Sequence, residues 1–190
     1  MRSTSRRRVY AAAVMVMVLL AAGSIPAIRD ALILDSASVR AGQLWRLLTA
    51  HFVHLRLQHA AVNIAAALAL LYWAGLTGQL RTALYFVLLS PLAISAGLLY
   101  LAFDWYAGLS GVLHGLLVYL LLKAPLPIRI TGLVLLSAKL LWQVNGGGEM
   151  TQQVGPVVLH EAHWLGVAAG ALAFVVLESG LLMRWRAPPD

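Results

Sequence analysis

The stretch GLSGVLHGLLVYLLLKAP, residues 108–125, decides how this sequence folds. From Ser110 to Lys123, an α-helix covers only about 20 Å at 1.5 Å per residue. The hydrocarbon core of a bilayer is about 30 Å thick, and Gly108 and Asp104 disfavour an earlier start, so this helix begins below the membrane surface. Because non-helical backbone at that depth must be enclosed by protein or line a water-filled cavity, a polar site is expected beside Ser110.

The composition predicts an integral membrane protein. Of 190 residues, 61% are hydrophobic and 11% are charged, whereas soluble domains carry about 25% charged residues. No hydrophilic block is long enough to fold alone, so we expect one domain over residues 1–190. The absence of cysteine excludes disulfides, thiolate nucleophiles and Cys-ligated metals. The net charge of +7 comes from basic residues at the ends of apolar runs, which favours a role in topology over nucleic-acid binding.

The apolar runs predict an all-α polytopic bundle of six spans in the lipid bilayer. These spans cover residues 9–28, 59–76, 82–103, 110–123, 127–142 and 160–180. An even number of spans places both termini on one side, and the arginines before the first span predict that this side is cytoplasmic. A second interpretation makes residues 1–24 a cleaved signal peptide.

Three further expectations concern segments near the outer surface. The loop over residues 29–58, with Trp45 and Arg46, is amphipathic and is expected to lie in the membrane interface. The glycines at 146–148 predict a flexible lid. Lys139 is expected to extend outward to the membrane surface.

Ser110 and His163 together indicate nucleophilic catalysis. The N-terminus of a helix directs free N–H groups at an oxyanion that forms beside its first residue. His163 shares a helical face with Gly166 and Gly170, and Gly111 gives the serine helix a matching small surface, so the two helices can approach closely. A histidine in contact with a serine can take its proton as general base. With no carboxylate well placed, we expect a dyad; the alternative is that the glycines only serve helix packing.

Other polar residues have supporting or rival roles. His114 is four residues after Ser110 and is a rival base, although its greater depth favours a buried hydrogen-bonding role. His59 and Asn63 stack on one face of the second span and can complete an oxyanion pocket, or form a polar clamp between helices. His54 is expected to support the loop structure.

Three motifs make the chain similar to rhomboid intramembrane serine proteases. HLRLQHAAVN at 54–63 resembles the H-x4-H-x3-N pattern of the family, GLSG its G-x-S-G nucleophile motif, and AHWLGVAAG its last-helix motif. The resemblance implies a six-helix fold whose short fourth helix starts at the catalytic Ser110. It implies His163 as base, His59 with Asn63 as oxyanion donors, and no cofactor. Gly108, Gly111, His54 and His114 are our candidates for supporting positions.

The compact length and the form GLSGVLHG most resemble the rhombosortase branch. That branch implies a bacterial inner-membrane enzyme, open to the periplasm, that removes C-terminal transmembrane tails of the GlyGly-CTERM type from membrane-anchored proteins. Two alternatives remain. HEAH at 160–163 suggests a metal-dependent membrane enzyme or transporter, although its histidines stand at i and i+3 where the zinc-protease motif needs i and i+4. An inactive adaptor that binds membrane helices is the other.

Overall fold

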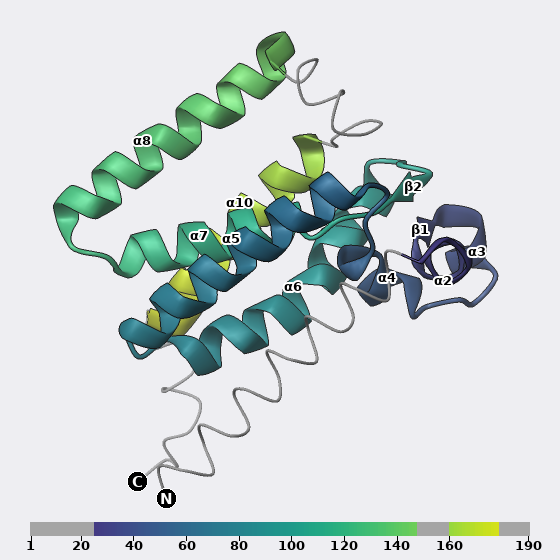
Figure 1. Ribbon diagram of the computed structural model, residues 1–190, viewed down its shortest axis with the longest axis horizontal. Coiled ribbons are helices and arrows are strands. Elements are labelled where there is room, and N and C mark those ends of the chain that lie inside the picture. The colour runs from purple at the N-terminus through teal and green to yellow at the C-terminus, as the bar shows by residue number, and fades with distance from the viewer. Residues whose placement is uncertain (1–24, 148–159, 179–190) are drawn as a thin grey trace, which may run out of the picture.

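The computed structural model describes residues 25–147 and 160–178, and this part of the chain is mostly helical (Figure 1). Five longer helices form the body. They are α5 (Leu57–Leu76), α6 (Leu80–Tyr100), α7 (Ser110–Lys123), α8 (Leu126–Trp142) and α10 (His160–Glu178). Short elements precede or join them: α2 (Pro26–Leu32), β1 (Leu34–Asp35), α3 (Ser36–Arg40), α4 (Arg46–Thr49), η1 (Ala50–Phe52), β2 (Trp105–Tyr106) and the π-helix η2 (Gln143–Gly147).

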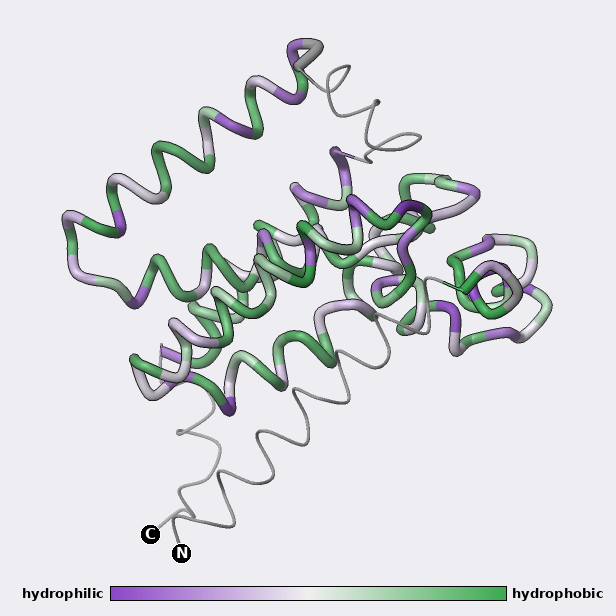
Figure 2. The backbone as a smooth tube through the Cα atoms, in the orientation of Figure 1, coloured by the Kyte–Doolittle hydropathy of each residue, from purple (hydrophilic) through white to green (hydrophobic). Residues whose placement is uncertain are grey.

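The helices have the lengths that a membrane protein requires. Among the described residues, four helical segments are long and apolar enough to cross a membrane: 57–76, 80–100, 126–145 and 160–178. Hydrophobic residues dominate these helices, while many hydrophilic ones gather near their ends and in the segment before α5 (Figure 2). The predicted bounds of the second, third and fifth spans are wrong by no more than a few residues. Those of the short fourth helix are confirmed at both ends.

The first predicted span needs correction at its end. Residues 9–24 lie outside the described part of the chain. Ile25 is extended, with φ −81° and ψ 120°, and Pro26 begins the separate helix α2. Proline has no N–H to continue a helix and disfavours helical backbone in the residue before it. A helix from residue 9 therefore cannot run unbroken to residue 28.

The segment before α5 folds against one end of the bundle (Figure 1). Leu34 pairs with Tyr106 and Asp35 with Trp105, so β1 and β2 form a two-stranded antiparallel sheet. Arg46 is buried and donates from Nη1 to the carbonyl of Ile33 at 2.7 Å. The β1–β2 pairing holds the chain that enters α7 against the segment before α5.

Part of the segment 29–58 exposes apolar side chains. Arg46 faces the protein, whereas Leu44 and Trp45 are exposed. An exposed leucine and tryptophan beside one another suit the boundary between lipid and water. The placement of this segment in the interface stays a prediction.

Helix α7 lies in the centre of the bundle and contacts α5, α6, α8 and α10. Its backbone meets that of α10 through glycines. A Cβ atom at Gly111 would lie 2.6 Å from the carbonyl oxygen of Ala162, and one at Gly115 would overlap the carbonyl of Gly166. Gly166 and Gly170 are equally close to the backbone of α7. Small residues on both faces therefore permit the near approach that the sequence predicts.

We expect Gly170→Ala to destabilise the protein, because its Cβ would overlap the carbonyl of Gly115. Overpacking of this kind costs about 1–3 kcal/mol. Gly75→Ala is the matched control: its Cβ would meet only Leu80 Cδ2, at 3.8 Å. Thermal unfolding in detergent should show a lower midpoint for Gly170→Ala and an unchanged or slightly higher one for Gly75→Ala. Equal midpoints would contradict the glycine contact.

His51, which the sequence argument did not single out, joins the segment before α5 to α6. Ser95 donates its hydroxyl proton to the carbonyl of Leu47 at 2.7 Å. The same oxygen lies 3.0 Å from His51 Nε2 and accepts its proton. His51 is fully buried, and burial lowers its pKa from 6.5 to about 3. Burial, with a smaller effect of His59, also lowers the pKa of His54, to about 4.

These shifts predict acid sensitivity. A histidine whose folded-state pKa is depressed keeps its contribution to stability above its unfolded pKa of 6.5. As the pH falls below that value, the unfolded chain takes up a proton that the folded chain does not, so stability decreases toward pH 3. His51→Gln keeps a donor for Ser95 without a titrating ring. We expect melting midpoints between pH 7 and 4.5 to fall less steeply in His51→Gln than in the wild type, and parallel curves would contradict this.

Candidate active site

Ser110 and His163 lie in hydrogen-bond contact where α7 and α10 meet. His163 Nε2 is 2.9 Å from Ser110 Oγ. His163 is 2% exposed, whereas Ser110 is half-buried. A buried imidazole beside a reachable hydroxyl is the arrangement that activates a serine as nucleophile.

The turn that leads into α7 is fixed by Gly108 and Tyr106. Gly108 has φ +129°, in a region that residues with a Cβ rarely adopt. Its N–H donates to the carbonyl of Ala50 at 3.0 Å, and its carbonyl accepts from the Tyr106 hydroxyl at 2.6 Å. A Cβ at Gly108 would also lie 3.0 Å from His59 Cε1. Only glycine therefore lets the chain pass His59 and start a helix at Ser110.

Helix α7 begins at Ser110, and the first N–H groups of a helix have no partner within it. Leu109, at the N-cap position, makes no side-chain hydrogen bond to the first turn of α7.

Burial raises the pKa of the Tyr106 phenol above its ordinary value, and hydrogen bonds with the Gly111 backbone and the Ser110 side chain oppose this shift. Tyr106 thus belongs to the surroundings of Ser110, although the sequence argument did not name it. Its position just before the G-x-S-G motif was the available signal.

His114 contacts the site without facing the serine hydroxyl. Its Nδ1 lies 2.6 Å from the backbone carbonyl of Ser110, and its ring stacks on that of His163 with centroids 4.1 Å apart. Its Nε2 lies 2.7 Å from Lys139 Nζ. Both ring nitrogens of His114 are therefore engaged elsewhere, and the imidazole that faces Ser110 Oγ belongs to His163.

Lys139 and Gln143 come to the site from α8 and η2. The expectation that Lys139 extends outward is wrong: its ammonium turns to His114 and also lies 3.4 Å from Gln143 Oε1. Gln143 is buried, and its Oε1 lies 3.2 Å from His163 Nδ1. Gln143 was not predicted from the sequence. The i, i+4 spacing of Lys139 and Gln143 near the end of a mainly apolar helix could have revealed it.

His59, in the first turn of α5, lies beside the Gly108 turn, and His54, just before α5, contacts the His59 ring. The His59 ring is next to Gly108, and the Asn63 amide donates to the His59 carbonyl at 2.9 Å. His54 is buried, and its ring meets that of His59 edge-on at 5.1 Å. The structure therefore brings His54 and His59 together beside the turn and places Asn63 one helical turn along α5. Gly111 lies at the α7–α10 contact.

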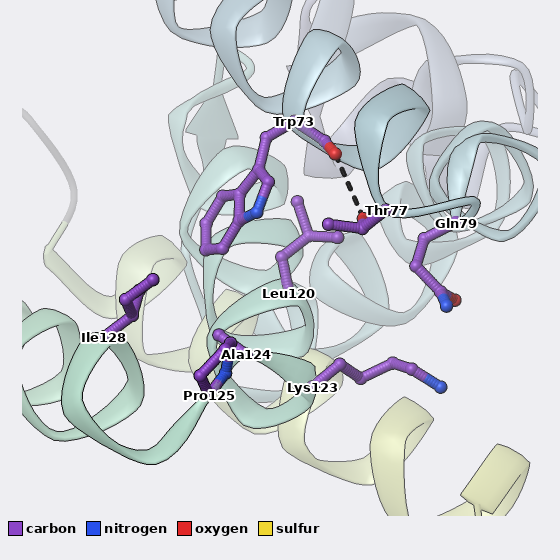
Figure 3. A pocket seen from close by; sticks show the side chains of 8 residues that line it. All are labelled: Trp73, Thr77, Gln79, Leu120, Lys123, Ala124, Pro125 and Ile128. Carbon is purple, nitrogen blue, oxygen red and sulfur yellow. Dashed lines mark hydrogen bonds between the residues drawn. The ribbon is translucent and has the colours of Figure 1, made fainter.

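Two further features concern a metal site and a second binding site. Within residues 25–147 and 160–178, no three His, Cys, Asp or Glu side chains gather into a group able to hold a metal ion. A cavity of about 110 Å³ lies among α5, α7 and α8, where Trp73, Lys123 and Pro125 line it (Figure 3). Because Lys123 ends the helix that Ser110 begins, this cavity is about 20 Å from the serine and is separate from the candidate site.

Residues 41–179 match the family model described as Rhomboid domain. The match extends over most of the chain and includes each element that contributes to the site. The chain belongs to the rhomboid family, whose members are intramembrane serine proteases. Among the curated proteins, no relative matches the chain.

Proposed function

We propose that this protein is an intramembrane serine endopeptidase in which Ser110 is the nucleophile and His163 the general base. The observation that carries the proposal is the 2.9 Å contact between Ser110 Oγ and His163 Nε2 at the start of a short apolar helix. Membership of the rhomboid family supports the same reaction class.

The reaction follows from the positions of these two groups. Ser110 Oγ attacks the carbonyl carbon of a substrate peptide bond while His163 Nε2 accepts the hydroxyl proton. The proton passes to the leaving amine, the C–N bond breaks, and an acyl-enzyme ester remains on Ser110. Water or an amine nucleophile then attacks the ester and gives a proton to His163. His163 passes this proton to Ser110 Oγ as the ester C–O bond breaks, which releases an acid or an amide product and the free serine.

We assign oxyanion stabilisation to the first backbone amides of α7 together with His59 and Asn63. An oxyanion beside Ser110 would lie at the positive end of a helix dipole, where N–H groups already point. His59 is held next to the Gly108 turn. Asn63 makes one amide hydrogen bond to the His59 carbonyl, which leaves its second N–H for substrate.

We further assign the chain to the rhombosortase branch, in a bacterial inner membrane with six spans and both termini in the cytoplasm. The active site would then open to the periplasm. The substrates would be membrane-anchored proteins with a C-terminal tail made of a small-residue motif, an apolar helix and a basic end. The form GLSGVLHG and the arginines before the first span support this assignment.

We expect Ser110→Ala to abolish tail removal, because no other hydroxyl in the described site faces His163 Nε2. The measurement is mass spectrometry of the C-terminus of a co-expressed tailed protein. Ser90→Ala is the matched control, since the buried Ser90 hydroxyl has no hydrogen-bond partner among the described residues. Continued cleavage by Ser110→Ala would exclude the proposed nucleophile.

A labelling experiment tests whether His163 is the base. A fluorophosphonate probe should label the wild type and His160→Ala but neither Ser110→Ala nor His163→Ala. Cleavage that needs His160 and is blocked by a chelator, while fluorophosphonate labelling is unchanged, would instead favour a metal-dependent enzyme. A purified protein with no cleavage and no labelling would favour an adaptor.

His59→Ala and Asn63→Ala should each lower kcat by about 100-fold, with a smaller change in KM, because an oxyanion donor acts only in the transition state. Asn145→Ala, which changes an exposed amide on η2, is the control for loss of an amide side chain. A rise in KM with unchanged kcat would instead assign His59 and Asn63 to substrate binding.

A further inference from the structure

We propose that Gln143 is a positioning residue that holds His163 in the tautomer able to accept the Ser110 proton. This inference rests on the proposed function, because it assigns Gln143 a part in the same reaction. It extends the expected Ser-His pair by a neutral third group in the place where a carboxylate stands in many serine hydrolases.

The donors and acceptors around Gln143 determine which nitrogen of His163 carries the proton. A lysine ammonium has protons to donate and no acceptor. The Gln143 atom 3.4 Å from Lys139 Nζ must therefore be the carbonyl oxygen Oε1. That same oxygen lies 3.2 Å from His163 Nδ1, so Nδ1 must donate a proton to it. Nε2 is left with its lone pair toward Ser110 Oγ, as a general base requires.

The donors around His114, whose ring stacks on His163, also determine which of its nitrogens carries the proton. Lys139 donates to His114 Nε2, so His114 Nδ1 carries a proton and donates it to the Ser110 carbonyl. His114 in this state has no lone pair left to compete for the hydroxyl of Ser110. Its ring lies nearly parallel to that of His163, with an interplanar angle of 18°. The stack restricts tilting of His163, while Gln143 restricts its rotation in the plane of the ring.

The local fold explains how one helix supplies both groups. Lys139 and Gln143 are four residues apart, so they lie on one face of α8 as it passes into η2. π-Helical turns are rare, and those inside α-helices occur frequently at functional sites. Gln143 is 5% exposed, whereas Trp142 and Val144 on either side are at least half exposed. The glutamine is thus directed into the protein at the level of His163.

Loss of the Gln143 acceptor would remove the preference for the productive tautomer. Hydrogen-bonding partners that orient metal-ligating histidines typically contribute about 10- to 100-fold to activity, and we take the same magnitude for His163. We therefore expect Gln143→Leu to lower kcat by about that factor and to leave KM nearly unchanged. Gln143→Glu keeps an oxygen acceptor at the same distance along the side chain and should restore most of the activity. Asn145→Leu, an exposed change in the same π-helix, should retain wild-type kcat.

A spectroscopic measurement separates positioning from stability and from the proposed function. Histidine labelled with ¹⁵N in the Ser110→Ala background reports the tautomer of His163 without any turnover, and its signals are assigned by comparison with His163→Ala. We expect a proton on Nδ1 both when Gln143 is retained and in the Gln143→Glu variant, and a mixture of tautomers in Gln143→Leu. If Gln143→Leu does not fold, Gln143→Met, which keeps the unbranched shape, replaces it.

The outcomes are distinct. Unchanged kcat and tautomer in Gln143→Leu would overturn the inference. So would a loss of activity that Gln143→Glu does not restore and that accompanies a lower melting midpoint with the tautomer unchanged. If Ser110→Ala still cleaves substrate, the proposed function fails, while the tautomer measurement still decides whether Gln143 sets the proton on His163.

Discussion

The close approach of α7 and α10 is the constraint on which the candidate site depends. The carbonyls of Gly111 and Gly115 contact glycines of the opposite helix where any side chain would overlap them. Because these contacts are between backbones, little side-chain rearrangement can change the spacing of the helices. Ala162 lies against Gly111. Ser110 is the residue before Gly111, and His163 is the residue after Ala162. The packing of small residues therefore fixes the distance between the hydroxyl and the imidazole.

The candidate site also requires a hydrogen-bond partner for each of its buried polar groups. A polar atom without a partner is expensive in an apolar medium, so a serine and two histidines at this depth need hydrogen bonds as well as space. Each ring nitrogen of His114 and His163 has a partner, and the Gln143 oxygen accepts from two sides. Such a chain of donors and acceptors has one consistent arrangement of protons, which gives the site a defined chemical state.

The sequence alone predicted the parts of this structure that repeat along a helix. Apolar runs indicated the longer helices, and glycines spaced along one face indicated the contact between α7 and α10. The length from Ser110 to Lys123 predicted the short helix. What it could not predict were contacts made by long side chains between different helices. Lys139 is an example. Its partner His114 lies on another helix, 25 residues away in the sequence. The sequence around Lys139 gave no sign of this contact, so the side chain was expected to reach the membrane surface.

Two local features were not predicted, for different reasons. The β1–β2 pairing involves only two residues from each strand, too few to produce an alternating pattern in the sequence. Ile25 and Pro26 break an apolar stretch that is continuous by composition alone. The partner of each short strand lies far along the chain and leaves no period in the hydropathy. Pro26, in contrast, was a signal in the sequence itself, because proline disfavours helical backbone in the residue before it.

The elements that build the site contribute unequally to the core. Helix α7 buries nine of its residues, whereas α8 buries only Leu136 and Leu140. The loss of a core contact on α7 would therefore disturb the fold and the site together. A change on the polar face of α8 removes little apolar contact and acts mainly on the orientation of His163. Placement of the reacting groups and orientation of the base are thus carried by different helices, and mutations can separate them.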